Sequence, residues 1–343
     1  MKGTRCGPWC YSFALPVGLL AYGAYLGSSA DTGGAKVLRL GHSLNQQHPV
    51  HAGMEVMAAD LAERSSERLR IEIYPDEQLG PERELIEMLQ IGSLAMTKVS
   101  TGPLESFSPA VAVLSLPYLF NDRDHFWRVM DGAVGEELLD VSVPFGLKGL
   151  CYYDAGARSF FINRKTGRTV RTPGDLNGLS IRVMKTRTSM RMVELLGAKP
   201  VPIPFGELYS ALDSGTVDGA ENNAPSLLTT RQYEVCTSYS LNQHTRIPDI
   251  LIMSADAWRR LTPEEQGWVK QAAVASSHYQ RELWHRAEQE ALDEMEAAGL
   301  EIVRELDPEP FRERVKALYG DPEFTSPDAR RLIDRIREQG GAS

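Results

Sequence analysis

Several catalytic and metal-binding patterns are missing from this sequence of 343 residues. It has no Cys-x-x-Cys, His-Glu-x-x-His or calcium-loop spacing, so it predicts neither a bound metal nor another cofactor. It also lacks the Gly-x-Ser-x-Gly elbow, a Ser-x-x-Lys pair, a phosphate-binding loop and a dinucleotide fingerprint. These absences exclude the enzyme classes that such motifs mark, but not an enzyme that assembles single residues in a cleft.

Cysteine is scarce, with four residues in the whole chain. Cys6 and Cys10 lie near the amino terminus, which leaves Cys151 and Cys236 for the rest of the protein. Cys151 stands in an apolar run, and Cys236 lies near a predicted helix end. One pair of cysteines could form a disulfide in an oxidising compartment, but two buried free thiols fit these positions at least as well.

Positive charge is in the minority, with 37 Lys and Arg against 46 Asp and Glu and a net charge of −9. An acidic chain does not predict a nucleic-acid partner. The apolar content of 42% and charged content of 24% are typical of a globular protein. The length admits two ordinary domains.

A long apolar run occurs near the amino terminus. Lys2 and Arg5 precede an apolar stretch over about residues 9–26, and Ser28-Ser-Ala then supplies the small residues that a signal peptidase reads. The pattern predicts a secretory signal peptide over residues 1–30. Pro16 and nearby glycines make an uncleaved anchor helix a poor alternative. Cleavage removes two positive charges and changes the net charge from −9 to −11.

Strands and helices alternate through the first part of the chain. Alternating strands are predicted to begin at Val37 and Leu69, and an amphipathic helix with Met54, Met57 and Leu61 on one face lies between them. Pro81 opens a second helix. This order predicts an α/β layer with a largely parallel sheet. Ligands of such sheets gather at the carboxyl ends of the strands, which places the loops 42–45 and 100–103 at a cleft.

A long helix is predicted near the carboxyl end. Thr262-Pro-Glu-Glu is a capping box with proline at the first helical position, and apolar residues recur until Gly299. Roughly 36 helical residues would span about 54 Å, which exceeds one small domain. The alternative is a coiled-coil arm, but alanine, aromatic residues and methionine occupy too many core positions for a regular heptad seam.

The most distinctive stretch runs from residue 178 to residue 225. It begins Gly178-Leu-Ser-Ile-Arg-Val, where a strand would send Ile181 and Val183 one way and Arg182 the other. Arg182 then faces either solvent from an edge strand or a cleft. The motifs that follow are Leu196-Gly-Ala, Pro204-Phe-Gly-Glu-Leu-Tyr and Val217-Asp-Gly-Ala-Glu-Asn.

In this order the motifs resemble the solute-binding proteins of TRAP transporters, the periplasmic receptors that deliver organic acids to a sodium-coupled membrane permease. The resemblance extends to Tyr74-Pro-Asp-Glu-Gln-Leu-Gly, Leu116-Pro-Tyr-Leu-Phe and Gly156-Ala-Arg-Ser-Phe-Phe. It covers nearly the whole chain after the predicted signal peptide. It implies an α/β fold with two domains of the periplasmic Venus-flytrap kind (type II-like) and a long helix that spans both.

The resemblance also implies domain boundaries and a periplasmic location. The first domain would comprise residues 31–156 with 248–285, and the second residues 157–247 with 286–343. We expect the two to close over a ligand about a hinge, because the implied ligand groups come from both.

A carboxylate clamp is the main implied feature of the site. Arg182 corresponds to the arginine that holds the ligand carboxylate in the family, and a guanidinium suits this role because its planar fork donates two parallel hydrogen bonds. Phe205 would form an apolar wall, or be an ordinary core aromatic. His244 would line the far wall, or hold the hinge loop. The full set of predicted ligand-binding residues is Arg182, Arg158, Asn222, Ser43, Ser100, Glu221, Asn223, Phe205 and His244.

The expected ligand is a sugar acid. The version Asp218-Gly-Ala-Glu-Asn-Asn resembles the branch of the family that binds hexuronates, and it supplies donors and acceptors suited to neighbouring hydroxyls. The implied partners are a small organic acid and the TRAP permease. Two alternatives stay open: a receptor for a C4-dicarboxylate or another small carboxylate, and a periplasmic enzyme that acts on acidic sugars through Arg182 and a nearby glutamate.

Overall fold

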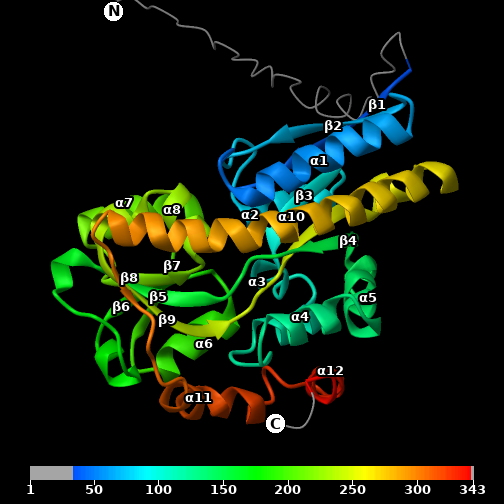
Figure 1. Ribbon diagram of the computed structural model, residues 1–343. Helices are drawn as coiled ribbons and strands as arrows, with labels where there is room; N and C mark the ends of the chain where they lie inside the picture. The colour runs from blue at the N-terminus through cyan, green and yellow to red at the C-terminus, as the bar shows by residue number, and fades with distance from the viewer. Residues whose placement is uncertain (1–33, 341–343) are drawn as a thin grey trace, which may run out of the picture.

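The computed structural model describes residues 34–340 and shows two lobes joined by a long helix (Figure 1). The predicted signal peptide, residues 1–30, lies outside the described residues. Each lobe is built on its own mixed sheet with helices packed on it. The predicted two-lobed α/β class is confirmed.

The sheet of the first lobe has the strand order β2-β1-β3-β10-β4. β1 runs parallel to both β2 and β3, whereas β10 is antiparallel to β3 and β4. Its strands are β1 (Lys36–Gly41), β2 (Leu69–Tyr74), β3 (Met96–Ser100), β4 (Leu147–Tyr153) and β10 (Asp249–Ser254). Its helices are α1 (Pro49–Arg64), α2 (Glu82–Gln90), α3 (Thr101–Leu104), α4 (Arg123–Met130), α5 (Ala133–Asp140) and α9 (Ala255–Arg259).

The sheet of the second lobe has the strand order β11-β9-β5-β8-β6-β7. β6 lies between β8 and β7, so Arg182 is not on an edge strand and the solvent-facing alternative is wrong. The strands are β5 (Arg158–Asn163), β6 (Ser180–Val183), β7 (Lys199–Pro202), β8 (Gly219–Asn222), β9 (Cys236–Thr245) and β11 (Glu301–Val303). The helices are α6 (Arg187–Leu195), α7 (Leu208–Ser214) and α8 (Ala224–Thr229).

Short 3-10 helices connect these elements. They are η1 (Pro109–Ser115), η2 (Val143–Phe145), η3 (Arg164–Thr166), η4 (Pro173–Leu176), η5 (Phe205–Glu207), η6 (Gln232–Val235) and η7 (Lys316–Gly320). The chain crosses between the lobes from β4 to β5 and returns from β9 to β10. We expect the predicted hinge to lie at these two crossings.

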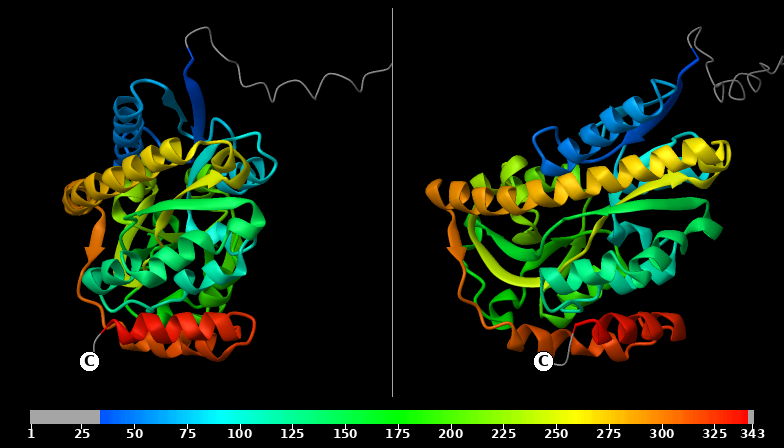
Figure 2. Two further views of the ribbon diagram at one scale, coloured as in Figure 1. Left: turned by 90° about the vertical axis from the view of Figure 1, so that its right-hand side faces the viewer. Right: turned by 45° about the vertical axis from the view of Figure 1, so that its right-hand side comes forward.

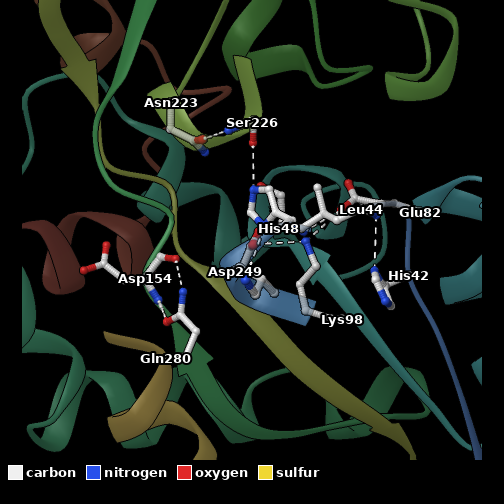
Figure 3. Close-up of polar contacts among 12 residues, drawn as sticks. His42, Leu44, His48, Glu82, Lys98, Asp154, Asn223, Ser226, Asp249 and Gln280 are labelled. Atoms are coloured by element: carbon white, nitrogen blue, oxygen red, sulfur yellow. Dashed lines mark hydrogen bonds and ion pairs between the residues drawn. The ribbon is translucent and has the colours of Figure 1, made fainter. Parts of the chain in front are cut away.

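The predicted long helix is α10 (Pro263–Ala297), with 35 residues and the expected capping box at Thr262 and Glu265. It packs against α1 and β4 in the first lobe and against α8 and β11 in the second, and Figures 1 and 2 show it running across both. Gln280 of α10 holds the first hinge crossing from both sides. Its side chain accepts from Asp154 N at 2.7 Å and donates to Asp154 O at 2.9 Å (Figure 3).

The carboxyl-terminal helices lie below the two lobes in Figures 1 and 2. α11 (Glu309–Val315) packs against α6 and β9 of the second lobe, whereas α12 (Pro327–Glu338) packs against η1 and α5 of the first. Arg331 and Arg335 of α12 both pair with Glu137 of α5. The predicted domain boundaries stay a prediction, and these contacts place α12 beside elements of residues 31–156.

The sequence left open whether the two cysteines of the lobes form a disulfide. Cys151 on β4 and Cys236 on β9 are both buried and free, which confirms the alternative of two unpaired thiols. Burial raises the pKa of each thiol to about 12, so neither is a reactive thiolate at neutral pH.

Within the described part of the chain, none of the helices combines the length and the apolar character needed to cross a membrane.

Candidate ligand-binding cleft

A cavity of about 240 Å³ lies between the lobes and takes residues from both. This volume is slightly below the range of about 300 to 1,000 Å³ that is typical of ligand pockets, so it suits a ligand at the small end of that range. The loops after β1 and β3 contribute, as expected for the carboxyl ends of parallel strands. The predicted residues that line it are Ser43, Ser100, Arg158, Arg182, Phe205, Asn222 and Asn223.

Arg158, at the start of β5, is almost fully engaged within the protein. Its Nη2 donates to Oε1 of Glu221 at 2.9 Å and to the Glu221 carbonyl at 2.8 Å, while Nε donates to Oε2 at 2.5 Å. Its Nη1 donates to Oδ1 of Asn222 at 2.9 Å. Since a guanidinium has five N–H groups, one remains for a ligand.

Glu221 and His244 are not among the residues that line the cavity, so a contact of either with a ligand stays a prediction. His244 is fully buried behind Arg158, stacks on Phe160 and lies 3.3 Å from the Glu221 carboxylate. Burial alone would raise the pKa of Glu221, but the Arg158 guanidinium and His244 hold it at about 2. Glu221 therefore stays ionised and fixes Arg158, and the structural role of His244 is the one that fits.

Arg182 differs from Arg158 because it lacks a carboxylate partner. It extends from β6 into the cavity, is 3% exposed, and donates from Nε to the Ile203 carbonyl at 2.8 Å. Among residues 34–340, no acid forms an ion pair with it. Burial lowers its pKa to about 10, so the guanidinium remains charged at neutral pH. Its two terminal nitrogens are thus available to an anion in the cavity.

Several charged residues of the first lobe that line the cavity were not predicted from the sequence, and three of them form one cluster. Lys98 of β3 is 2% exposed, and its Nζ lies 3.0 Å from Asp249 Oδ2 and 3.8 Å from Glu82 Oε1 (Figure 3). Glu82 Oε1 also accepts from Ser100 N at 2.9 Å. All three line the cavity. A lysine inside an otherwise buried strand was the available signal, because such a charge needs a partner.

The amide and hydroxyl residues of the cavity wall also hold local structure. Ser100 Oγ accepts from Gly102 N at 3.4 Å, and Asn223 Oδ1 accepts from Ser226 N at 2.8 Å, so both cap short helices. Asn222 Oδ1 accepts from Arg158 and from Asn223 N at 2.9 Å each. The side-chain oxygens of Ser100, Asn222 and Asn223 thus already accept hydrogen bonds within the protein. What these side chains have left for a ligand is mainly N–H and O–H donors.

Phe205 serves as both a wall and a packing residue. It lies on η5 of the second lobe, lines the cavity and packs against the buried cluster of the first lobe. The next residue, Gly206, donates from its backbone to Glu77 Oε1 at 3.2 Å. The two alternatives for Phe205 therefore combine, since a ring from one lobe closes the cavity by packing on the other.

Further contacts join the lobes around the cavity. The Glu105 carboxylate of the first lobe accepts from the backbone of Arg187 and from Thr188 Oγ1 at 2.7 Å, at the start of α6. His48 Nε2 lies 3.2 Å from Ser226 Oγ (Figure 3), while its Nδ1 accepts from Val50 N. Burial and Lys98 lower the pKa of His48, so it is neutral and donates to Ser226. These contacts describe lobes that are closed on each other.

Metal ligands are not gathered at this site. Within residues 34–340, histidine, cysteine and carboxylate side chains do not form a group of three or more with a geometry for a metal ion. The chemistry that the cavity offers is ionic recognition and hydrogen bonding.

Comparison with a family model gives a match over residues 40–324 to the family described as bacterial extracellular solute-binding protein, family 7. An uncharacterised Salmonella typhimurium protein, YiiZ, is 38% identical over 288 residues, which cover 83% of this chain and 86% of that protein. The 2,3-diketo-L-gulonate-binding periplasmic protein YiaO of Escherichia coli is 30% identical and covers 81% of this chain and 84% of its own.

Solved structures of the same kind are also similar. A TRAP periplasmic solute-binding protein from Xanthobacter autotrophicus with bound β-D-galacturonate has a TM-score of 0.84 and 36% identity, covering 88% of this chain and 99% of its own. One from Chromohalobacter salexigens with bound D-glucuronate has a TM-score of 0.85 and 30% identity, with the same coverage of 88% and 99%. These relatives are named as solute-binding proteins, in agreement with a receptor rather than an enzyme.

Proposed function

This chain belongs to family 7 of the bacterial extracellular solute-binding proteins, and we propose that it captures a sugar acid for a TRAP transporter. The favoured ligands are hexuronates, because similar structures carry galacturonate or glucuronate. The receptor would deliver its ligand to the membrane permease. The predicted signal peptide and the periplasmic relatives support an assignment to the periplasm.

The observation that carries this proposal is the unpaired guanidinium of Arg182. A buried cation without a counter-ion is costly, and a ligand carboxylate would supply that counter-ion. The Arg182 fork can donate two parallel hydrogen bonds to the two oxygens of a carboxylate. The remaining N–H of Arg158 would reach the same end of the ligand.

The opposite wall suits hydroxyl groups. On the first lobe Lys98 is a donor and Asp249 and Glu82 are acceptors, and the Asn222 amide adds a donor from the second lobe. A hydroxyl both donates and accepts, so a polyhydroxylated acid can satisfy this wall in a way that a bare alkyl chain cannot. Phe205 and Ile203 supply an apolar surface for the C–H face of a sugar.

Calorimetric titration tests the proposal with four probes: glucuronate, galacturonate, glucose and succinate. We expect saturable binding of at least one uronate and none of glucose, which lacks the carboxylate. At a ligand concentration of 100 times Kd, the uronate should also stabilise the fold by about 2.7 kcal/mol. Absence of binding to both uronates, or tighter binding of succinate, would overturn the proposal. NMR of the uronate during incubation should show no conversion, whereas product formation would indicate the enzyme alternative.

A further inference from the structure

Each wall of the cavity has a group of three charged residues, and the net charges of the two groups have opposite signs. On the second lobe, Arg158 and Arg182 face one carboxylate, Glu221, which leaves a net charge of +1. The first-lobe triad, defined here as Lys98, Asp249 and Glu82, has one ammonium group and two carboxylates. With both carboxyl groups ionised, its net charge is −1.

The ammonium group of this triad already has a carboxylate partner within the protein. Lys98 Nζ donates to Asp249 Oδ2 at 3.0 Å, and Lys98 and Asp249 are buried together. The Glu82 carboxylate is the more accessible member, with its side chain 17% exposed, and it lies at the first turn of α2 on the cavity wall. A ligand that reaches this wall therefore meets a surplus of acceptor oxygens.

We infer that the first-lobe triad restricts the receptor to sugar acids with a single carboxylate and rejects aldaric acids, the corresponding diacids. This inference rests on the proposed function, because it places the first carboxylate on Arg182. The second carboxylate of an aldaric acid would then face Glu82 and Asp249. Juxtaposed like charges across an interface are strongly unfavourable, whereas a hydroxyl at the same position can donate to either acid.

The sharpest test compares gluconate with glucarate by calorimetric titration at pH 7.5, with glucuronate as the reference ligand. Gluconate and glucarate are both open-chain acids and differ only at the last carbon, which is a CH2OH group in gluconate and a carboxylate in glucarate. We expect glucarate to bind at least about tenfold more weakly than gluconate. Equal or tighter binding of glucarate would overturn the inference.

Glu82→Gln provides the second arm, and Glu63→Gln is its matched control. Glu63→Gln makes the same change of charge at an exposed position of α1 in the same lobe. We expect the glucarate-to-gluconate ratio of Kd to shrink severalfold in Glu82→Gln and to stay unchanged in Glu63→Gln. An unchanged ratio in both variants would count against the triad as the cause of the selectivity.

The outcomes separate this inference from the function on which it rests. If wild-type protein binds none of the three acids, the proposed function fails and the inference falls with it. If it binds glucuronate but neither open-chain acid, Glu82→Gln decides, since glucarate and not gluconate must gain affinity. Should Glu82→Gln not fold, the wild-type ratio and Asp249→Asn remain as tests.

Discussion

The two walls of the cleft differ in how they treat buried charge. On the first-lobe wall, Lys98 is paired with Asp249 and lies near Glu82, so its charge is compensated inside the protein. On the second-lobe wall, Arg158 is compensated by Glu221, but Arg182 is left without an acid. A buried charge without a partner lowers the stability of the fold. We therefore expect a ligand to supply the missing negative charge at Arg182.

Burial raises the pKa of the acids on both walls, but the neighbouring charges make the net shifts opposite. Arg158 and His244 overcome burial at Glu221 and hold its pKa at about 2. At Glu82, burial dominates over the nearby Lys98, and its pKa is raised above the ordinary value. One wall thus keeps its charges down to strongly acidic pH, whereas the other gains a proton earlier as the pH falls.

The largest expected effect is on folding and comes from Lys98→Met. This change leaves Asp249 and Glu82 without their cation, and breaking a buried pair by removing one partner costs about 3–5 kcal/mol. Urea unfolding should reveal this loss. Lys270→Met, at an exposed position of α10, is the control and should stay within about 0.5 kcal/mol of wild type. An unfolding midpoint of Lys98→Met equal to that of the control would mean that the first wall does not depend on this pair.

The next effect is on binding and comes from Arg182→Lys. A single ammonium replaces the two-pronged fork, which should cost on the order of 2 to 5 kcal/mol of binding, or roughly 30- to 5,000-fold in Kd. Unfolding without ligand should change far less, because Arg182 has no acid partner to lose. Titration with glucuronate measures the effect, and Arg39→Lys on the exposed face of β1 is the control. Binding within threefold of wild type would remove Arg182 from the site.

A change of pH should have a smaller effect. It alters the protonation of Glu82 on the first-lobe wall at a higher pH than that of Glu221 on the second. Glu82 is surrounded by Lys98, Asp249 and Glu77, and burial, the largest influence, raises its pKa above the ordinary 4.5. That proton favours the folded state, so the stability linked to Glu82 is complete below pH 4.5 and falls as the pH rises through the raised pKa. Glu221 behaves oppositely and loses its contribution only between pH 4.5 and about 2.

At pH 5 we therefore expect Glu82 to be protonated to a greater extent than an ordinary glutamate, so the first-lobe triad has less negative charge than at pH 7.5 while the second wall keeps its own. The discrimination between gluconate and glucarate should shrink by up to about tenfold, the factor that corresponds to 1.36 kcal/mol. Titrations at the two pH values measure the ratio. A ratio that grows on acidification would contradict the assignment of the selectivity to Glu82.

The smallest expected effect concerns the contact that ties the walls together. The Glu105 carboxylate accepts hydrogen bonds from the start of α6, and burial raises its pKa. Glu105→Gln replaces this carboxylate with a neutral amide. The loss should be about 1 kcal/mol, or roughly fivefold in glucuronate affinity. Small-angle scattering without ligand should show a more open average shape. If scattering and affinity both match wild type, this contact does not contribute to closure.

Much of the fold and one wall of the site could be predicted from the sequence, because their causes are local. The capping box at Thr262 and the stop at Gly299 bound α10 almost to the residue. The alternation of Ile181, Arg182 and Val183 already separates a core face from a cleft face. These features depend on the periods of strands and helices and on hydrogen bonds within a few residues.

The charged cluster on the first-lobe wall was decided by tertiary structure alone. Lys98 and Asp249 are 151 positions apart, and the register of antiparallel β3 and β10 brings them onto one face. Likewise, the engagement of Arg158 by Glu221 depends on the pairing of β5 with β8. Both arginines look alike in the sequence. Only the packed sheets determine which guanidinium is compensated and which is left for a ligand, because compensation depends on distances between strands that are remote in the chain.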